Sequence, residues 1–468
     1  MIEFFPQYFP VACHTDYVGP GSIFVAIKGF STQGASFIPL AIKRGARMIV
    51  VEDFTSISAN LWQLIYHHQV IVQKVENARR ALAHLSARAA KYPASKLKII
   101  GITGTKGKTT TAHLLFHILQ TAGISSALIS SVSNHINNYC FDSSLTTPQP
   151  DYLHQFLRLC VEQGVRVVIL EVAAHAISLH RIEGIQFDAV IITNIAREHL
   201  EFYESMEAYA QAKYQLLNYR KPGAIAWLNG DDERLRSLNA RRVKYFGFSS
   251  NATMHAMIQD NAILFSYESE KIIIKCPQIE GIYNIANCLS AAAGAQTFSL
   301  NLGMIQKAFL TFPGVAGRGE KYRLPNGAMA LIDYAHNPFS YQALFQTVRL
   351  QTDHLIIVFG AGGNRDRARR PEMGRIAALF GDIIIITSDN PRDEDPLSIA
   401  REIMEGIPLE KRANTFQELD RKKAIELAYK YSKKGSIIAC VGKGPDEYQL
   451  IKNKKIPFSE RAIIRSLG

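Results

Sequence analysis

One ten-residue stretch restricts the fold of this chain more than any other feature, the segment Gly101-Ile-Thr-Gly-Thr-Lys-Gly-Lys-Thr-Thr110. It follows an apolar run that predicts a β-strand over residues 97–103, and it opens a helical pattern at about Lys108. Its glycines let backbone N–H groups approach phosphate oxygens, the Lys108 ammonium supplies positive charge, and the Thr109 hydroxyl can bind Mg²⁺. The strand–loop–helix context favours a phosphate-binding loop over a plain glycine turn, although Ile102 breaks the strict spacing of its glycines.

The order of apolar runs predicts an α/β protein. The length predicts about three domains, because 468 residues exceed the size at which a chain folds around one hydrophobic core. Short strands over 22–27 and 47–51 with a helix over 37–43 indicate a small α/β unit that ends in a polar linker at 91–96. Strand-then-helix repeats follow, which favour parallel, doubly wound sheets. The predicted domains are residues 1–96, 97–316 and 317–468.

Composition argues against several classes of protein. Hydrophobic residues make up 47% and charged residues 20% of the sequence, and no apolar run approaches the roughly 18 residues of a membrane span. The chain starts without a secretory-signal pattern and its six cysteines form no Cys-x-x-Cys pair, so we expect a reduced, cytoplasmic protein. The net charge of +12 suits anionic small substrates, since no nucleic-acid-binding motif accompanies it. We expect a monomer with no nucleic-acid or membrane partner.

Polar residues end two strands of the predicted central sheet. Glu171 and His175 follow the apolar run at 167–172, at the strand end where open α/β sheets bind ligands, and a carboxylate there can bind Mg²⁺. A second polar cluster, which ends at His199, follows the next strand, and Lys213 lies on the helix after it. Each of these residues has an ordinary alternative, an ion-pair partner for Glu171 and a solvated surface position for the others.

Three further polar clusters follow strands predicted in the last domain. They are Asp333-Tyr-Ala-His-Asn-Pro338, Gly360-Ala-Gly-Gly-Asn-Arg-Asp366 and Asp389-Asn-Pro-Arg-Asp-Glu-Asp-Pro396. Because carboxyl ends of parallel strands share one edge of a sheet, we expect the clusters to converge on one crevice. Arg365 and Arg392 would suit a carboxylate there, since a planar guanidinium pairs it through two hydrogen bonds. Taken alone, Asp-Asn-Pro-Arg is a turn that starts a helix.

The order of these motifs resembles the Mur ligases, in particular the branch of UDP-N-acetylmuramoyl-tripeptide synthetases, from about Phe24 to the end of the chain. The motifs are Gly104 to Thr109, Glu171 with His175, Asn194 with His199, Lys213, Gly281-Ile-Tyr-Asn-Ile-Ala-Asn287, Gly317-Arg318, Asp333 to His336, and Asp389 to Arg392. The resemblance implies a three-domain architecture, with an acceptor-binding N-terminal domain, a central phosphate-loop ATPase domain and a C-terminal Rossmann-like domain that binds an amino acid.

For the nucleotide site, the resemblance implies an ATP-dependent carboxylate–amine ligase that works through an acyl phosphate. Lys108, His199 and Lys213 are the implied catalytic residues. The implied ATP contacts are Gly104, Thr105, Lys106, Gly107, Lys108, Thr109, Thr110, Asn287, Arg318, Asp333 and His336. Two Mg²⁺ ions are implied, held by Thr109, Glu171, His199 and a Lys213 carbamylated by CO₂.

For the remaining substrates, the resemblance implies a UDP-muramoyl dipeptide held by Thr146, Thr147 and Arg181, and meso-diaminopimelate in peptidoglycan precursor synthesis. The implied amino-acid pocket consists of Arg365, Asp389, Asn390, Arg392, Gly442 and Asp446. Charge agrees with this choice, because the extra distal carboxylate of diaminopimelate can pair with Arg392, whereas lysine would bring a second cation to it.

Several positions depart from the family pattern. His14-Thr15-Asp16, Ala173-Ala174 and Leu179 do so in the implied acceptor site, and Lys106, Glu198 and Asn364 stand where the family has Asn, Asp and Asp. Two alternatives therefore stay open, a paralogue with the same chemistry on another acceptor and a non-catalytic binding protein that kept the fold. The presence of Lys108, Glu171, His199 and Lys213 argues against the second, because fold maintenance requires none of them.

Overall fold

The computed structural model describes residues 5–29, 32–198, 202–259, 262–277, 281–452 and 454–467. It divides the chain into two compact units, of which unit 1 comprises Met1–Lys275 and Ala286–Thr311, and unit 2 comprises Cys276–Ile285 and Phe312–Gly468. Unit 2 is thus built from two separate stretches, and helix α9 (Ile282–Ala295) begins in unit 2 and continues in unit 1. The exact limits of the three predicted domains stay a prediction.

The first part of unit 1 is a four-stranded parallel sheet in the order β1-β2-β3-β4. Its elements are β1 (Val11–Ala12), β2 (Ile23–Val25), α1 (Ile38–Lys43), β3 (Met48–Val51), α2 (Ala59–His67), β4 (Ile71–Lys74) and α3 (Ala78–Ala89). The strands and the helix expected here are confirmed. The expected linker at 91–96 is wrong in part, because Pro93–Lys96 forms a 3-10 helix in which Pro93 and Ala94 are buried, in contact with α5 (Pro150–Glu162).

The rest of unit 1 is an eleven-stranded sheet in the order β15-β14-β13-β12-β11-β10-β5-β9-β6-β7-β8. Its strands are β5 (Lys98–Thr103), β6 (Ser126–Ile129), β7 (Ser133–Ile136), β8 (Tyr139–Asp142), β9 (Val167–Glu171), β10 (Phe187–Ile192), β11 (Arg220–Asn229), β12 (Val243–Gly247), β13 (Met254–Gln259), β14 (Ala262–Tyr267) and β15 (Glu270–Ile274). The central strands are parallel as expected, and the antiparallel pairs lie at the two edges.

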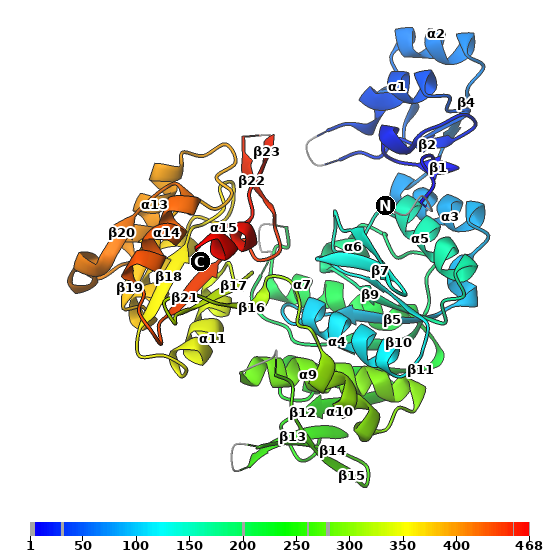
Figure 1. Ribbon diagram of the computed structural model, residues 1–468. Helices are drawn as coiled ribbons and strands as arrows, with labels where there is room; N and C mark the ends of the chain where they lie inside the picture. Colours follow the sequence, from blue (N-terminus) through cyan, green and yellow to red (C-terminus); the bar gives the residue numbers. More distant parts are fainter. Residues whose placement is uncertain are drawn as a thin grey trace. The chain divides into compact units, whose positions relative to one another are not determined.

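Helices cover both faces of this sheet. They are α4 (Lys108–Thr121), α5, α6 (Ala174–Ser178), α7 (Met206–Tyr214), α8 (Glu233–Arg236), α9 and α10 (Leu302–Thr311). Phe156 of α5 packs with Ile99, Val168 and Val190 on one face. Helices α4 and α10 lie against each other (Figure 1), and α9 approaches α4 so closely that a Cβ at Gly294 would meet the side chains of Leu115 and Ile191.

Unit 2 contains a six-stranded sheet in the order β16-β17-β21-β18-β19-β20, in which all pairs except β16·β17 are parallel. Its elements are β16 (Arg318–Arg323), β17 (Met329–Asp333), α11 (Pro338–Arg349), β18 (Leu355–Phe359), α12 (Arg369–Phe380), β19 (Ile383–Ile386), α13 (Pro396–Glu405), β20 (Thr415–Gln417), α14 (Arg421–Tyr431), β21 (Ile437–Val441), β22 (Tyr448–Ile451), β23 (Lys454–Pro457) and α15 (Glu460–Ser466). The expected strands of this region are confirmed.

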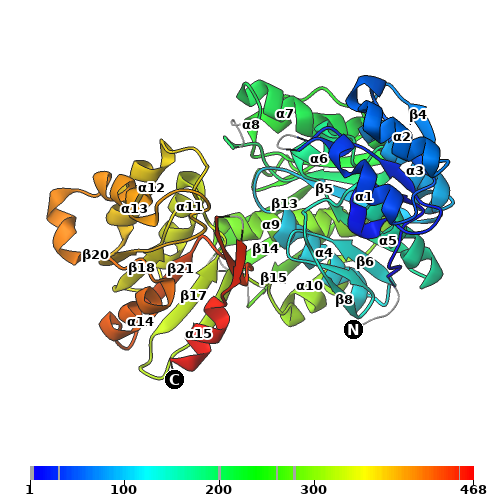
Figure 2. The same ribbon diagram turned by 90° about the horizontal axis from the view of Figure 1, so that it is seen from above.

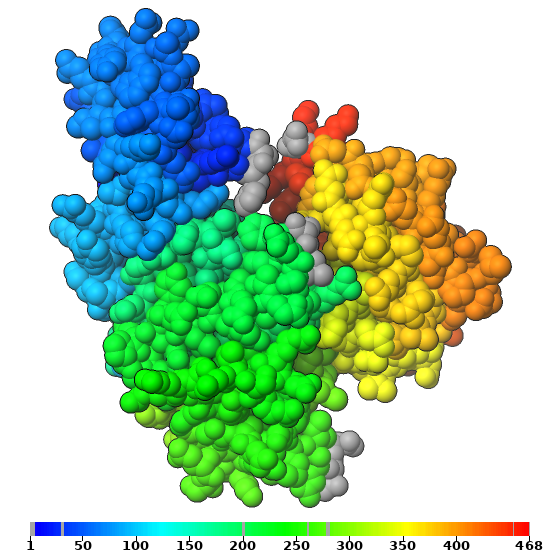
Figure 3. All heavy atoms as spheres, turned by 180° about the vertical axis from the view of Figure 1, so that it is seen from behind, coloured from blue at the N-terminus to red at the C-terminus, as the bar shows by residue number. Residues whose placement is uncertain are grey.

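The strands of unit 2 bury both faces, which explains their continuous apolar sequence. Figure 2 shows α11, α12 and α13 on one face of the sheet and α14 and α15 on the other. The yellow-to-red atoms of this unit form one continuous surface in the space-filling view (Figure 3). Within the described part of the chain, no helix is long and apolar enough to cross a membrane.

Candidate active site

The phosphate loop lies at the carboxyl end of β5, between the ends of β9 and β10. Gly104 and Gly107 have φ angles of +145° and +82°, which favour glycine, and a Cβ at either would collide, with the Thr193 hydroxyl and the Asn287 amide respectively. The loop therefore folds as the glycine spacing predicts, and its backbone is open to the close approach of a ligand. Asn287, which was expected to bind nucleotide, lies beside it.

Two lysine ammonium groups point at the same turn of this loop. Lys108 Nζ donates to the carbonyl oxygens of Gly104 and Thr105, each at 3.0 Å, and Lys213 Nζ donates to Gly104 O at 2.7 Å. The Lys213 side chain is buried, with an exposed fraction of 2%. Burial holds the pKa of the Lys213 amine well below its usual value, and the nearby Lys108 charge lowers that pKa further. The site thus favours a neutral amine on Lys213.

Hard oxygen donors gather at the first turn of α4. Thr109 Oγ1 lies 3.0 Å from Glu171 Oε1 and 2.8 Å from Ser131 Oγ, and the Ser131 backbone N–H donates to Glu171 Oε2 at 2.9 Å. Hydroxyl and carboxylate oxygens with nucleotide phosphate are a donor set that Mg²⁺ accepts, so these residues fit the ion. Among the described residues, no group of three or more His, Cys, Asp or Glu side chains could hold a metal ion by itself.

Residues 193–198, the segment after β10, form several hydrogen bonds with the phosphate loop. Asn194 accepts from the backbone N–H of Lys106 at 2.9 Å and donates to its carbonyl at 3.0 Å, while Thr105 and Ala196 exchange hydrogen bonds. At the end of the segment, Lys106 Nζ pairs with Glu198 Oε1 at 2.6 Å. His199 lies outside the described residues, so its predicted role stays a prediction.

The expected acceptor residues lie beside the end of β9. Thr147 Oγ1 donates to Glu171 O at 2.8 Å and accepts from Ala173 N at 3.0 Å, and Arg181 Nη1 donates to Thr147 O at 2.9 Å. Thr147 is buried and Thr146 is half-buried. Thr147 and Arg181 therefore use their side chains to hold backbone groups in place beside the end of β9, and these residues form one wall of the expected acceptor site. Their contact with an acceptor stays a prediction.

In unit 2, Asp333 ends β17 and organises the loops around it. Its carboxylate accepts from the N–H groups of Gly319 at 2.8 Å and Ala335 at 2.7 Å, and the Arg318 guanidinium lies 4.5 Å from the centre of the Tyr334 ring. His336 Nδ1 lies 2.7 Å from Tyr334 O. The structure thus brings together the three residues of this unit that were expected at the nucleotide, Arg318, Asp333 and His336.

A second cluster in unit 2 surrounds the buried ammonium of Lys443. Lys443 Nζ donates to Asn390 Oδ1 at 3.0 Å and lies 3.5 Å from Asp389 Oδ1. Burial lowers the pKa of Lys443 and raises that of neighbouring Asp446, while Asp389 acts against the first shift and Lys443 against the second. A Cβ at Gly442 would lie 3.3 Å from Asp389 Oδ2, so this glycine permits close packing.

The loop after β19 brings Arg392 to the same cluster. Arg392 has a φ of +53°, and its backbone bonds to Leu450 and Lys452 hold this conformation. Its Nη1 donates to Gly363 O at 2.6 Å. Burial lowers the pKa of Arg392, and the charge of Arg365 adds to that effect, so the two guanidinium groups lie close enough to repel. Two converging cations are an arrangement suited to an anionic ligand group.

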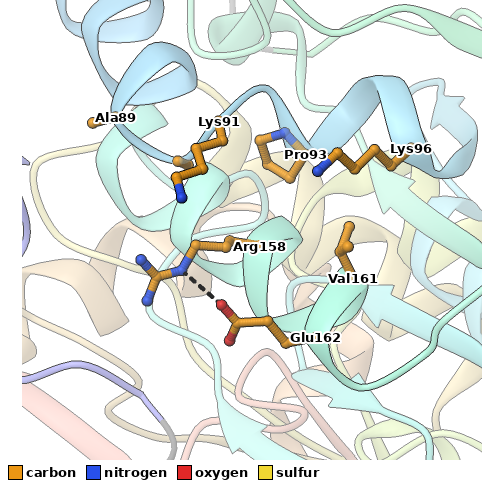
Figure 4. Close-up of a pocket in the computed structure, with 8 residues that line it drawn as sticks. Ala89, Lys91, Pro93, Lys96, Arg158, Val161 and Glu162 are labelled. Carbon is orange, nitrogen blue, oxygen red and sulfur yellow. Dashed lines mark ion pairs between the residues drawn. The ribbon is translucent and has the colours of Figure 1, made fainter.

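Two surface cavities of unit 1 lie away from these clusters. Figure 4 shows one of about 190 Å³ between Lys91, Lys96 and the Arg158–Glu162 ion pair. A larger one of about 640 Å³ includes Lys98 and Val167, the first residues of β5 and β9. The larger cavity therefore adjoins the amino ends of these strands, whereas the phosphate loop follows the carboxyl end of β5. Neither cavity is lined by a residue of the candidate site.

Comparison with known proteins identifies the family. Three family models match, described as Mur ligase family, catalytic domain (residues 11–90), Mur ligase middle domain (102–295) and Mur ligase, glutamate ligase domain (317–444). A UDP-N-acetylmuramoyl-L-alanyl-D-glutamate--2,6-diaminopimelate ligase of Clostridium perfringens is 35% identical over 460 residues, which cover 95% of this chain and 91% of that protein. A ligase of the same name from Chlorobaculum tepidum is 34% identical over 476 residues, covering 97% and 91%. The chain belongs to the Mur ligase family.

Solved structures agree with the fold of this Mur ligase. A UDP-N-acetylmuramoyl-L-alanyl-D-glutamate--2,6-diaminopimelate ligase gives a TM-score of 0.64 at 24% identity and covers 98% of this chain and 94% of that chain. MurF from Acinetobacter baumannii gives a TM-score of 0.68 at 18% identity, covering 98% and 93%. The expected three-domain Mur ligase fold is confirmed. As a member of the family the protein is an ATP-dependent ligase that uses Mg²⁺, which sets aside the non-catalytic alternative.

The sequence did not single out two residues of this Mur ligase site. Ser131 lies after β6, and its hydroxyl and N–H groups reach Thr109 and Glu171 only because β6 pairs with β9. Lys443 follows Gly442, a residue of the implied amino-acid pocket, but nothing in its neighbours along the chain indicates a buried ammonium beside Asp389 and Asn390. The order of strands in the sheet is the missing information in both cases.

Proposed function

We propose that this Mur ligase joins the amine of meso-diaminopimelate to the terminal carboxylate of UDP-N-acetylmuramoyl-L-alanyl-D-glutamate, with ATP, in peptidoglycan precursor synthesis. The names of its relatives support the substrates. The observation that carries the reaction class is the buried Lys213 amine on the phosphate loop, beside Lys108 and the Thr109–Glu171 oxygen cluster. Because the reaction consumes ATP, we place it in the cytoplasm. We propose that the protein acts as a monomer, without nucleic-acid or membrane partners.

The chemistry replaces a poor leaving group with a good one. The acceptor carboxylate attacks the γ-phosphorus of ATP, ADP leaves, and the acyl phosphate forms; the amine then attacks the acyl carbon, phosphate leaves and a proton is released. Lys108 and the N–H groups of the loop hold the phosphates in line, which is the main protein contribution to phosphoryl transfer. Thr109 and Glu171 would hold Mg²⁺, which would neutralise charge on the phosphates.

Lys213 provides the second part of the proposal. Its amine is neutral enough to add to CO₂, which would form a carbamate and release one proton. Because the Lys213 Nζ donates to Gly104 O, that carbamate would lie beside the loop. A negatively charged carbamate there would hold a second Mg²⁺ together with His199. The ammonium group of Lys108, which lowers the pKa of the free amine, would stabilise the anion that replaces it.

Amino-acid selection is assigned to unit 2. Arg392 and Arg365 would pair the distal carboxylate of diaminopimelate, and Asp389 and Asn390 lie next to them. A paralogue with a different acceptor remains the second candidate, favoured by Ala173-Ala174 and Leu179 at the wall that Thr147 and Arg181 form.

The deciding experiment measures phosphate release with UDP-N-acetylmuramoyl-L-alanyl-D-glutamate, comparing diaminopimelate with lysine. We expect release that depends on both the acceptor and diaminopimelate and that disappears in Lys108→Ala, while circular dichroism shows an unchanged fold. ATP hydrolysis that ignores this acceptor but responds to another would favour the paralogue. Near-normal turnover of Lys108→Ala would remove the loop from the mechanism.

A further inference from the structure

Three lysines surround the phosphate loop, and they are used differently. Lys108 and Lys213 bond to carbonyl groups of the loop itself, whereas the Lys106 ammonium pairs with Glu198 at 2.6 Å. The exposed fractions of the Lys106 and Glu198 side chains are 26% and 13%, so the pair is partly shielded from water. A shielded pair holds its geometry better than a pair in open solvent.

The backbone of Lys106 is fixed independently of its side chain. Its N–H donates to Asn194 Oδ1, and its carbonyl accepts from Asn194 Nδ2 at 3.0 Å and Thr193 Oγ1 at 2.6 Å. The Glu198 carboxylate accepts a hydrogen bond from the Lys106 ammonium. The ion pair therefore links the far end of the 193–198 segment to the loop.

We propose that Glu198 is a positioning residue that keeps the Lys106 ammonium on the segment after β10, so that Lys106 orders this segment instead of binding nucleotide phosphate. A second ammonium group beside that of Lys108 would bind ADP more strongly and slow its release. Glu198 keeps the Lys106 ammonium from acting in this way. This inference rests on the proposed use of nucleotide by the loop, and its test by ADP binding needs neither the acceptor nor the amino acid.

The proposal predicts different effects on ADP binding, but the same effect on turnover, for variants of the two partners. In Glu198→Gln the Lys106 ammonium is released toward the phosphates, so the Kd for ADP with MgCl₂ should fall about 10-fold, which corresponds to about 1.4 kcal/mol. In Lys106→Gln no cation is released, so the Kd should stay the same or rise. Turnover should fall about 10-fold in both, because each loses the same contact.

Isothermal titration calorimetry with ADP and MgCl₂, without acceptor, measures the first effect, and kcat for phosphate release measures the second. The double variant Lys106→Gln/Glu198→Gln should have the kcat of either single variant, since a contact can be lost only once. The exchange Lys106→Glu/Glu198→Lys should recover part of that loss. As a matched control, removal of the exposed Lys422–Glu426 pair should change neither quantity.

The outcomes separate this inference from the proposed function. An ADP Kd that is equal in wild type and Glu198→Gln, or losses of kcat that multiply in the double variant, would overturn it. Absence of ADP binding in the wild type would instead remove the nucleotide site on which both rest. Thermal unfolding of each variant shows whether it is folded. If a single variant does not fold, the charge exchange still tests whether the ion pair supports turnover.

Discussion

At the scale of single residues, Lys213 combines a buried amine with a hydrogen bond to the phosphate loop. It is a fully enclosed amine whose hydrogen bond goes to Gly104 O and whose ammonium position lies 4.6 Å from the centre of the Tyr209 ring. A permanently charged lysine would be destabilising here, because the amine is buried and the largest effect of a charge on its pKa comes from the like charge of Lys108. The proposed carbamylation would convert the amine to an anion and so resolve that conflict.

The first prediction follows from this conflict. Lys213→Ala should lose turnover, because the oxygens of the carbamate are lost, and a short carboxylate such as acetate should restore part of it by entering the vacated space. The measurement is phosphate release with and without added acetate. A Lys213→Ala enzyme with wild-type turnover would contradict the assignment, and Lys307→Ala, a change in α10 outside the site, serves as the control.

A second prediction at this scale concerns Arg392. Truncation to Ala removes the partner of a desolvated carboxylate, a loss of about 2–5 kcal/mol, so kcat/KM for diaminopimelate should fall by about 30-fold or more. Lysine has no distal carboxylate to make this contact, so kcat/KM for lysine should fall far less. The comparison of both amino acids in wild type and Arg392→Ala decides it. Equal losses would show that Arg392 only supports the backbone around Gly363, and a wild type that prefers lysine would overturn the substrate assignment.

At the scale of elements, helix α5 carries a buried group that the chemistry does not use. His154 is fully buried, neither ring nitrogen has a hydrogen-bond partner within the described residues, and burial lowers its pKa from 6.5 to about 4. Below pH 6.5 the His154 ring becomes protonated in the unfolded chain but stays neutral in the folded state, so the free energy of unfolding falls as the pH falls.

The third prediction puts a magnitude on this effect. Between pH 6.5 and pH 4 the free energy of unfolding of the wild type should fall by about 3 kcal/mol more than that of His154→Leu, because each unit of pKa shift is worth about 1.4 kcal/mol. Chemical denaturation at several pH values measures it. Parallel pH profiles for the two proteins would contradict the prediction, because they would show that the ring takes up its proton as readily in the folded state as in the unfolded chain.

The elements also show how far sequence alone reaches. The phosphate loop was predictable because glycine spacing, the strand before it and the helix after it are all local, and the buried strands of unit 2 were predictable from their continuous apolar sequence. The edge strands β13 to β15 were not assigned, because their short half-exposed sequences lack a strong period. The pairing of Lys106 with Glu198 was also beyond reach, since it depends on β10 lying beside β5.

At the scale of the whole molecule, the two units have separate cores, and this gives the fourth prediction. Without ligands, calorimetry should resolve two unfolding transitions, since each unit buries its own apolar clusters. Addition of ADP with Mg²⁺ at about 100 times its Kd should stabilise unit 1 by about 2.7 kcal/mol. A single transition that shifts as one with ADP would show that the units unfold together.

The division of the chain between the units has a consequence for synthesis on the ribosome. Unit 1 lacks α9 and α10 until residues 286–311 have emerged, and by then the chain has already released the short stretch 276–285 that belongs to unit 2. Because α10 and α9 cover α4, the helix that the phosphate loop opens, the nucleotide-binding half can complete its fold only when about two thirds of the polypeptide has been translated. A nascent chain arrested before residue 286 should therefore expose the apolar face of α4 to chaperones, whereas one arrested after residue 311 has cleared the tunnel should not.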